Sequence, residues 1–353
     1  MENIEIGYRN IADAINNQMI TKSDEALDEI FNKDSKEASW IQPTMKSKDE
    51  LINAVKLASD KINENEEKLI IIADGDLKRL LEFLYISSDS EKDIYFLGDS
   101  LSTLDYAEAI KAMDKNDFSI IAISDGNEST EMICAFTLAR KALFKKYSLD
   151  KAQEKVYVIA PNGSSYFMKE AAENKYVRLH YNESVLSPGW LMTPAALLPA
   201  DIMGIETEDL IGGYEDMVTS LIWDKDGRNL SNVLCEYDIK CTYSEIEFKP
   251  FVEYLEQRIE KRTVIKENKM SAIVDLSVEE TNRDIIIPTF PGCNPEGSMK
   301  LMAEDYRKVK LNEYGEKGFP IIEIRLNEFN AKSLGSLIYY IEISIAILNR
   351  LKK

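Results

Sequence analysis

The chain has 353 residues, 44% of them hydrophobic and 30% charged, which is enough for two domains of roughly 150 residues, each with a buried core. Asp and Glu total 62 against 43 Lys and Arg, giving a net charge of −19. This negative charge argues against nucleic acid or an anionic membrane as a general partner, although a local basic pocket for a small anion is compatible with it.

The first segment, to about residue 45, is predicted to be polar and helical. From residue 69 onward, short apolar runs rich in β-branched residues alternate with segments of helical spacing. The predicted strands are 69–73, 94–99, 118–124, 155–161 and 175–181. Because strands that alternate with helices through short loops are typical of a parallel sheet covered on both faces, we expect an α/β domain here.

A second α/β region begins near residue 230, after a largely helical stretch that starts at Pro194. Its predicted strands are "NVLCEYD" (232–238), "SAIVDLS" (271–277), "DIIIP" (284–288) and "PIIEIRL" (320–326). The final helix has one apolar stripe, formed by Leu334, Ile338, Ile341, Ile345 and Leu348. The sequence therefore predicts an N-terminal helical segment (1–45), a first α/β domain (46–228) and a second, smaller α/β domain (229–353).

The loop "SDGNESTEM" (124–132) lies between a predicted strand and a predicted helix. Ser124 stands at the carboxyl end of the strand, where parallel sheets bind ligands, and Gly126 can adopt backbone angles that other residues avoid. Ser129 and Thr130 begin the helix, whose free N–H groups and dipole favour an anion. The pattern indicates a phosphate site, but the same residue types also make an ordinary helix cap.

Two longer segments resemble the glucose-6-phosphate isomerase family. The stretch 94–143, with a strand that ends in serine, then hydroxyl residues and a glutamate at the helix start, is similar to the family's sugar-phosphate-binding core. The stretch "LMTPAALLPADIMGIETEDLIGGYEDM" (191–217) is similar to the family's Leu-Thr-Pro, Leu-Leu-Pro and Gly-Ile-Asp segment. The similarity extends roughly from residue 39 to 351.

The resemblance implies two sugar-isomerase (SIS) domains, each a mainly parallel sheet flanked by helices, usually assembled as a homodimer. It also implies conversion of glucose 6-phosphate to fructose 6-phosphate, in glycolysis and gluconeogenesis. The substrate-binding residues that it implies are Ser124, Gly126, Ser129, Thr130 and, from a shortened turn after the first strand, Gly75.

The chain departs from the family in the phosphate loop, because Asp125 stands at the position of the family's lysine. A carboxylate about 4 Å from a phosphate charge, at an effective dielectric near 20, opposes binding by on the order of 4 kcal/mol before screening. We therefore expect weak sugar-phosphate binding unless Asp125 turns outward.

The catalytic residues of the family are not found either. Pro188 occupies its arginine position, and the segment that matches its catalytic glutamate contains Glu260 and Glu267 without the motif. The matching segment for its histidine lacks one, and the chain ends at Lys353, before the segment with the family's lysine. The one histidine, His180, is predicted to be a strand-edge or core residue. No catalytic residue is assigned, and no cofactor or metal is expected.

The four cysteines, Cys134, Cys235, Cys241 and Cys293, lack metal-type spacing and are predicted to be buried free thiols of a reducing cytosol. The N-terminus has no signal-peptide pattern, and the longest apolar segment is too short for a membrane span and contains Glu342. We expect a cytoplasmic protein.

Three functions remain open from the sequence. The first is a sugar-phosphate isomerase whose activity is weak or absent. The second is a non-catalytic module that binds a sugar, a sugar phosphate or another metabolite. The third is a structural subunit of an assembly, such as a heterodimer whose partner supplies the missing lysine and histidine.

Overall fold

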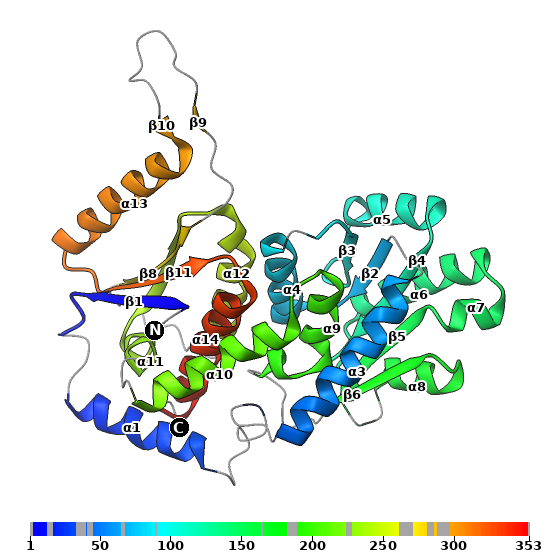
Figure 1. Cartoon of the computed structure of the whole chain (residues 1–353), viewed down its shortest axis with the longest axis horizontal. Helices are drawn as coiled ribbons and strands as arrows, with labels where there is room; N and C mark the ends of the chain where they lie inside the picture. Colours follow the sequence, from blue (N-terminus) through cyan, green and yellow to red (C-terminus); the bar gives the residue numbers. More distant parts are fainter. Residues whose placement is uncertain are drawn as a thin grey trace. The chain divides into compact units, whose positions relative to one another are not determined.

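The computed structural model describes residues 3–12, 17–32, 40, 45–64, 68–88, 90–161, 163, 165–181, 189–223, 228–260, 271–280, 286–287 and 297–351. The chain folds into two units (Figure 1). The central unit consists of Phe31–Glu208 and Glu253–Gln257, and the terminal unit of Met1–Ile30, Asp209–Val252 and Arg258–Lys353. The terminal unit thus combines both ends of the chain, whereas the predicted division was contiguous, with a boundary at 228.

The central unit contains one parallel sheet of five strands in the order β3-β2-β4-β5-β6. The strands are β2 (Lys68–Ile72), β3 (Asp93–Leu97), β4 (Phe118–Ile123), β5 (Val156–Pro161) and β6 (Val177–Tyr181). All five predicted strands are confirmed. Every residue of β4 and β5 is buried, as expected of central strands in a parallel sheet that is covered on both faces.

Helix α3 precedes the sheet, and further helices follow its strands (Figure 1). They are α3 (Met45–Asn63), α4 (Gly75–Ser87), α5 (Thr103–Lys115), α6 (Thr130–Lys146), α7 (Leu149–Gln153), α8 (Tyr166–Glu173), the 3-10 helix η2 (Trp190–Met192) and α9 (Pro194–Ile202). The rings of Phe136 on α6 and Phe167 on α8 pack 4.9 Å apart in the core. Trp190 and most of α9 are also buried, which fixes this apolar segment as packing.

The strand order places a topological switch point between β2 and β4. Ile72 at the end of β2 is opposite Leu97 of β3 on one side and Ala122 of β4 on the other. Because the chain leaves β2 toward β3 and later continues from β4 in the opposite direction, the loops after β2 and β4 diverge there. Ligands of open parallel sheets bind at such a point, so Gly75 and Ser124 flank the expected position.

The terminal unit contains a mixed sheet in the order β1-β11-β8-β7. Its strands are β1 (Ile4–Arg9), β7 (Asp238–Tyr243), β8 (Ser271–Glu280) and β11 (Ile321–Glu328). Strands β7, β8 and β11 are parallel, and β1 is antiparallel to β11. The helices are α1 (Asn17–Phe31), α10 (Thr207–Trp223), α11 (Arg228–Glu236), α13 (Met299–Glu316) and α14 (Ala331–Leu351), with the 3-10 helix η4 (Ile246–Phe248). Helix α12 (Lys249–Glu260) is shared, since its residues Glu253–Gln257 belong to the central unit.

Three predictions for this unit differ from the structure. The first 45 residues were expected to be helical, but they contain β1. The predicted strand 232–238 is mostly helix α11, because Leu230, Val233 and Leu234 recur at helical spacing and are buried on one side. Of the predicted strand 284–288, the structure describes Ile286–Ile287 as β9, which pairs with β10 (Gly297–Ser298) and not with the main sheet.

Helix α14 is the core helix of the terminal unit. It is long and apolar enough to cross a membrane, but 89% of its most apolar window is buried inside the protein. The five residues of the predicted stripe, from Leu334 to Leu348, are buried as expected. Two glycines allow α14 and α10 to pack closely. A Cβ on Gly213 of α10 would lie 1.9 Å from the Lys332 carbonyl oxygen, and a Cβ on Gly335 of α14 would lie 2.0 Å from the Leu210 carbonyl oxygen.

The described cysteines are free, but they are not all buried as predicted. Cys134 on α6 is exposed, because it lies on the side of the helix that faces away from the sheet, and Cys235 and Cys241 are half-buried. Cys293 lies outside the described residues. Within the described ranges, no group of three His, Cys, Asp or Glu side chains is placed to hold a metal ion.

Candidate functional site

Ser124 is fixed at the carboxyl end of β4. Its backbone N–H donates to the Ile159 carbonyl (2.9 Å), its hydroxyl accepts from the Gly126 N–H (2.9 Å), and its carbonyl accepts from the Tyr181 hydroxyl (2.6 Å). Gly126 has φ 102°, a left-handed conformation that is strained for residues with a Cβ. The loop therefore has a defined conformation that depends on Gly126.

Ser129 and Thr130 take ordinary positions at the start of α6. The Ser129 hydroxyl accepts a hydrogen bond from the Met132 N–H (3.3 Å), which makes Ser129 the N-cap of the helix. Thr130 is the first helical residue and its side chain is exposed. The helix-cap alternative thus describes Ser129, whose hydroxyl is already engaged.

An anion does lie beside this loop, and it is the chain's own Glu128. The Glu128 carboxylate accepts hydrogen bonds from the backbone N–H groups of Tyr166 (3.1 Å) and Phe167 (3.2 Å), which begin α8. The hydroxyls of Ser124 and Ser165 also bond to it. Free N–H groups at a helix N-terminus are a ready-made anion site, and here a glutamate from the neighbouring loop fills it.

Hydrogen bonding keeps Glu128 ionised. Burial alone would raise the pKa of Glu128, but the bonds from the Ser165 hydroxyl, the Phe167 N–H and the Ser124 hydroxyl outweigh it, so that the pKa is lowered. Conversely, burial raises the pKa of Tyr181, and the negative charges of Asp125 and Glu128 raise it further. The loop is consequently a region of negative potential.

Asp125 turns outward, which is the alternative that the sequence left open. Its side chain is exposed, and Oδ1 accepts a hydrogen bond from the Asn127 N–H two residues later (2.9 Å). This is a local turn that Asp makes readily. The inward carboxylate is that of Glu128, so the charge opposing a phosphate comes from a different residue of the same loop.

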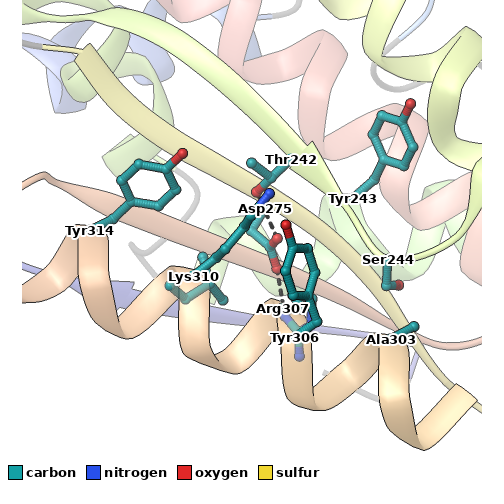
Figure 2. A pocket seen from close by; sticks show the side chains of 10 residues that line it. Thr242, Tyr243, Ser244, Asp275, Ala303, Tyr306, Arg307, Lys310 and Tyr314 are labelled. Atoms are coloured by element: carbon teal, nitrogen blue, oxygen red, sulfur yellow. Dashed lines mark hydrogen bonds and ion pairs between the residues drawn. The ribbon is translucent and has the colours of Figure 1, made fainter.

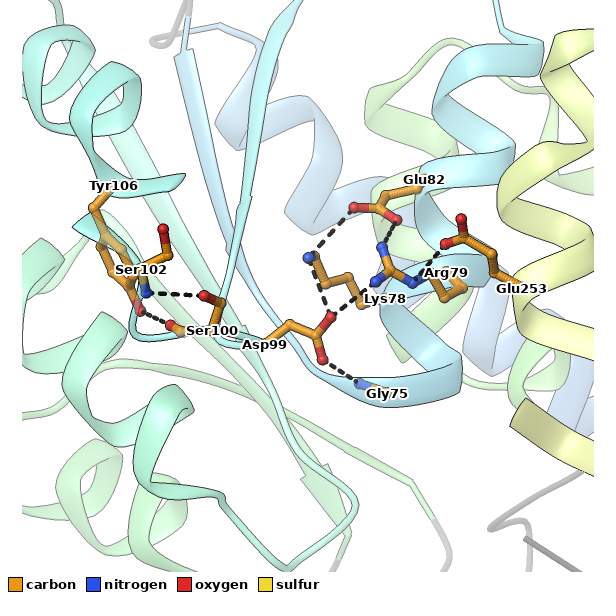
Figure 3. Close-up of polar contacts among 9 residues, drawn as sticks. All are labelled: Gly75, Lys78, Arg79, Glu82, Asp99, Ser100, Ser102, Tyr106 and Glu253. Atoms are coloured by element: carbon orange, nitrogen blue, oxygen red, sulfur yellow. Dashed lines mark hydrogen bonds and ion pairs between the residues drawn. The ribbon is translucent and has the colours of Figure 1, made fainter. Parts of the chain in front are cut away.

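Gly75 is also next to a carboxylate of the chain. It has φ 56° at the start of α4, and its N–H donates to Oδ1 of Asp99 (3.3 Å), which follows β3 (Figure 3). Asp99 in turn accepts from Arg79 (3.1 Å) and pairs with Lys78 (3.5 Å), both on α4.

The two cations on the first turns of α4 are fully engaged. Glu82 binds Arg79 (2.6 Å) and Lys78 (3.5 Å), and Glu253 lies 3.1 Å from Nε of Arg79 (Figure 3). With Asp99, three carboxylates face two cations. The N-termini of both α4 and α8 are thus occupied by acidic side chains of the chain itself. Asp99 was not predicted, although its position shortly after β3 was a usable signal. Ser165 lies in the segment 161–165, whose sequence predicts a turn and a helix cap, and it does cap α8 by accepting from the Met168 N–H (3.2 Å).

The remaining positions discussed from the sequence contribute no described catalytic group. His180 is exposed on the edge strand β6, as expected for a strand-edge residue. Glu260 is the last residue of α12, and nothing further is described of its side chain. Pro188 and Glu267 lie outside the described residues.

Curated relatives of the chain are glucose-6-phosphate isomerases. The chain is 23% identical to the enzyme of Enterococcus faecalis over 409 aligned positions, which cover 98% of this chain and 91% of that protein. It is 24% identical to the enzyme of Fusobacterium nucleatum, over 98% of this chain and 90% of that one. Since 409 exceeds the 353 residues of the chain, these relatives carry internal segments that the chain lacks. No family model matches the chain.

Solved structures share the fold. A hypothetical protein from Thermus thermophilus matches with a TM-score of 0.76 at 12% identity, over 98% of this chain and 94% of that one. A glucose-6-phosphate isomerase from Chlamydia trachomatis matches with a TM-score of 0.70 at 11% identity, over 99% and 84%. A tagatose-6-phosphate ketose/aldose isomerase from Escherichia coli follows with 0.54 at 12% identity, over 94% and 93%. The predicted fold, two α/β domains of sugar-isomerase type, is confirmed.

Proposed function

Because the chain is a divergent member of the glucose-6-phosphate isomerase family, we propose that it binds a sugar or sugar derivative at the carboxyl edge of the central sheet. We propose further that this ligand carries less negative charge than a hexose phosphate. Conversion of glucose 6-phosphate to fructose 6-phosphate is then weak or absent. The binding residues in this proposal are Ser124, Gly126, Ser129, Thr130 and Gly75.

The observation that carries the proposal is the position of Glu128. Its carboxylate takes the two N–H groups at the start of α8, and two serine hydroxyls bond to it as well. An incoming phosphate would compete for the same donors and would meet a negative charge. At about 4 Å and an effective dielectric near 20, each pair of like charges costs on the order of 4 kcal/mol before solvent screening.

A neutral or cationic sugar does not meet this obstacle. Hydroxyl groups of a sugar both donate and accept hydrogen bonds, so they can donate to Glu128 and Asp99 where a phosphate can only accept. An amino sugar would add a charge of the favourable sign. The acidic edge therefore supports glucose or glucosamine better than glucose 6-phosphate.

Two measurements on the purified protein test the proposal. A coupled assay for glucose 6-phosphate turnover should give a rate close to the blank, and titration calorimetry should detect glucosamine or glucose but not glucose 6-phosphate. Turnover well above the blank would overturn the catalytic part. Micromolar affinity for a hexose phosphate, or no binding of either neutral or cationic sugar, would overturn the binding part.

The assembly and the location of the protein stay predictions. The family resemblance favours a homodimer, or a heterodimer with an intact isomerase, in the cytoplasm. Light scattering on the purified protein and co-purification from its source cell would distinguish the two assemblies.

A further inference from the structure

The terminal unit contains a cavity that is independent of the sugar site. It has a volume of about 270 Å³ and lies at the carboxyl end of β7, between the sheet and α13 (Figure 2). Its polar lining consists of Thr242, Tyr243, Ser244, Asp275, Tyr306, Arg307, Lys310 and Tyr314. The carboxyl ends of parallel strands are the usual ligand positions in α/β units.

A buried ion pair forms the floor of this cavity. Asp275 on β8 is fully buried and accepts hydrogen bonds from Arg307 on α13 (2.5 Å) and from the Thr242 hydroxyl (2.7 Å). Burial raises the pKa of Asp275 despite the neighbouring Arg307. Both carboxylate oxygens of Asp275 thus have a donor within the protein, Oδ1 from Thr242 and Oδ2 from Arg307.

Three buried polar atoms at the cavity have no hydrogen-bond partner. They are Nε of Arg307 and the hydroxyl oxygens of Ser244 and Ser277. All three residues line a narrow crevice that adjoins the cavity, since Ser244 and Arg307 line both spaces. Buried polar groups are nearly always paired in folded proteins, so three unpaired donors in one place indicate a missing acceptor.

The charges around the two spaces are balanced. Arg307 pairs with Asp275 (2.5 Å) and with Glu323 (3.9 Å), and Glu245 and Glu304 line the crevice together with Lys300. The attraction for an anion therefore comes from the unpaired Nε of Arg307 and from Lys310 in the cavity lining. Tyr243, Tyr306 and Tyr314 supply apolar ring faces beside these polar groups. An apolar cavity with a few convergent polar groups is the usual form of a small-molecule site.

We propose that this cavity binds a small organic anion, with an oxyanion group at Lys310, Ser244 and Nε of Arg307 and an apolar body against the tyrosine rings. The oxyanion is a carboxylate or a phosphate monoester. This site does not depend on the proposed function of the central unit.

Benzoate, phenyl phosphate and the neutral benzyl alcohol are suitable probes, measured by titration calorimetry and by chemical shifts of the tyrosine rings. We expect an anionic probe to bind and benzyl alcohol not to bind. Tighter binding of phenyl phosphate would identify a phosphate monoester, and tighter binding of benzoate a carboxylate. Binding of neither anion, or equal binding of benzyl alcohol, would overturn the proposal.

Two variants locate the binding. Lys310→Gln removes an exposed positive charge and should lower the affinity for the anionic probe on the order of tenfold. Lys308→Gln is the matched control, because Lys308 is on the same helix, pairs with Glu304 (3.3 Å) and does not line the cavity. Equal losses of probe affinity in both variants would show that the effect comes from the general charge of the helix surface, and this would overturn the proposed site.

Ser244→Ala separates binding from folding. Since the Ser244 hydroxyl has no partner within the protein, its removal should leave stability unchanged or increased, while the probe loses a hydrogen bond and binds several-fold more weakly. Unchanged probe affinity would contradict the proposed position of the oxyanion. The Ser124→Ala variant, which is altered in the proposed sugar site, should bind the same probe as the unaltered protein does, which distinguishes the two sites.

Discussion

Glu128 follows β4 and Tyr166 begins α8, yet the Glu128 carboxylate accepts a hydrogen bond of 3.1 Å from the Tyr166 N–H. This bond joins two successive βα units of the central sheet at the edge where a ligand is expected. The helix N-terminus that would stabilise a phosphate instead stabilises a side chain of the same molecule. The predictions for this site follow from that contact.

The first prediction concerns the stability of the Glu128→Gln variant. The folded-state pKa of Glu128 is lowered from its ordinary value of 4.5, so its contribution is fully present above about pH 4.5 and is lost as the pH falls through the folded pKa. Because the side chain is partly exposed, we expect a loss of only about 1 kcal/mol at pH 7. Urea denaturation at pH 7 and near pH 3 measures it.

Asp125→Asn is the control for this experiment, since Asp125 is exposed and asparagine can keep the turn with Asn127. This variant should differ little from the unaltered protein at either pH. A Glu128→Gln deficit that persists unchanged in acid would show that the charge is not responsible.

The second prediction is a gain of phosphate binding in Glu128→Ser. The substitution removes the charge and frees the N–H groups of Tyr166 and Phe167, while leaving a hydroxyl in the loop. Glucose 6-phosphate should then bind at least tenfold more tightly, as judged by calorimetry, because one like-charge contact is removed. Asp125→Asn should give no comparable gain, and an equal gain in both variants would favour the sequence-based assignment of the repulsion to Asp125.

The third prediction concerns the buried pair in the terminal unit. Arg307→Met leaves the fully buried Asp275 without its cation, which should cost about 3–5 kcal/mol. Adding Asp275→Asn should recover part of this loss, since asparagine can still accept from Thr242 without a buried charge. Urea denaturation of the single and double variants measures the coupling, and strictly additive losses would contradict it.

The fourth prediction compares two adjacent glycines of α10. A Cβ on Gly213 would lie 1.9 Å from the carbonyl oxygen of Lys332 on α14, whereas on Gly212 it would meet only the end of that lysine's side chain at 4.0 Å. Gly213→Ala should therefore destabilise the protein by roughly 3 kcal/mol or more, because the overlap is with backbone.

Gly212→Ala is the matched control for this pair. It should be neutral or stabilising by about 0.5–1 kcal/mol, as alanine is the better helix former. Thermal denaturation of the two variants checks the difference. Similar melting temperatures for both would show that α10 and α14 are not in such close contact.

The sequence predicted the central sheet well because its signal is local. Each strand is a short apolar run, and each following helix has its own spacing, so the five strands can be found without knowledge of their partners. Strand β1 was missed because the strand that it pairs with, β11, lies at the other end of the chain. Ile4 pairs with Leu326 of β11, and the polar residues around β1 give no sign of that partner.

In the candidate site, too, the features that depend on neighbouring residues were predicted, and those that depend on distant residues were not. The sequence by itself determined Ser124 at a strand end, Gly126 in a turn and Ser129 as a possible cap, since each depends on a few neighbouring residues. Only the tertiary structure decided that Glu128, and not Asp125, is the inward carboxylate. Its partners Tyr166 and Phe167 are 38 and 39 residues away, and they become neighbours because β4 and β5 pair side by side. Spacing along the chain holds no information about which donors a flexible acid will reach once parallel strands have aligned their ends.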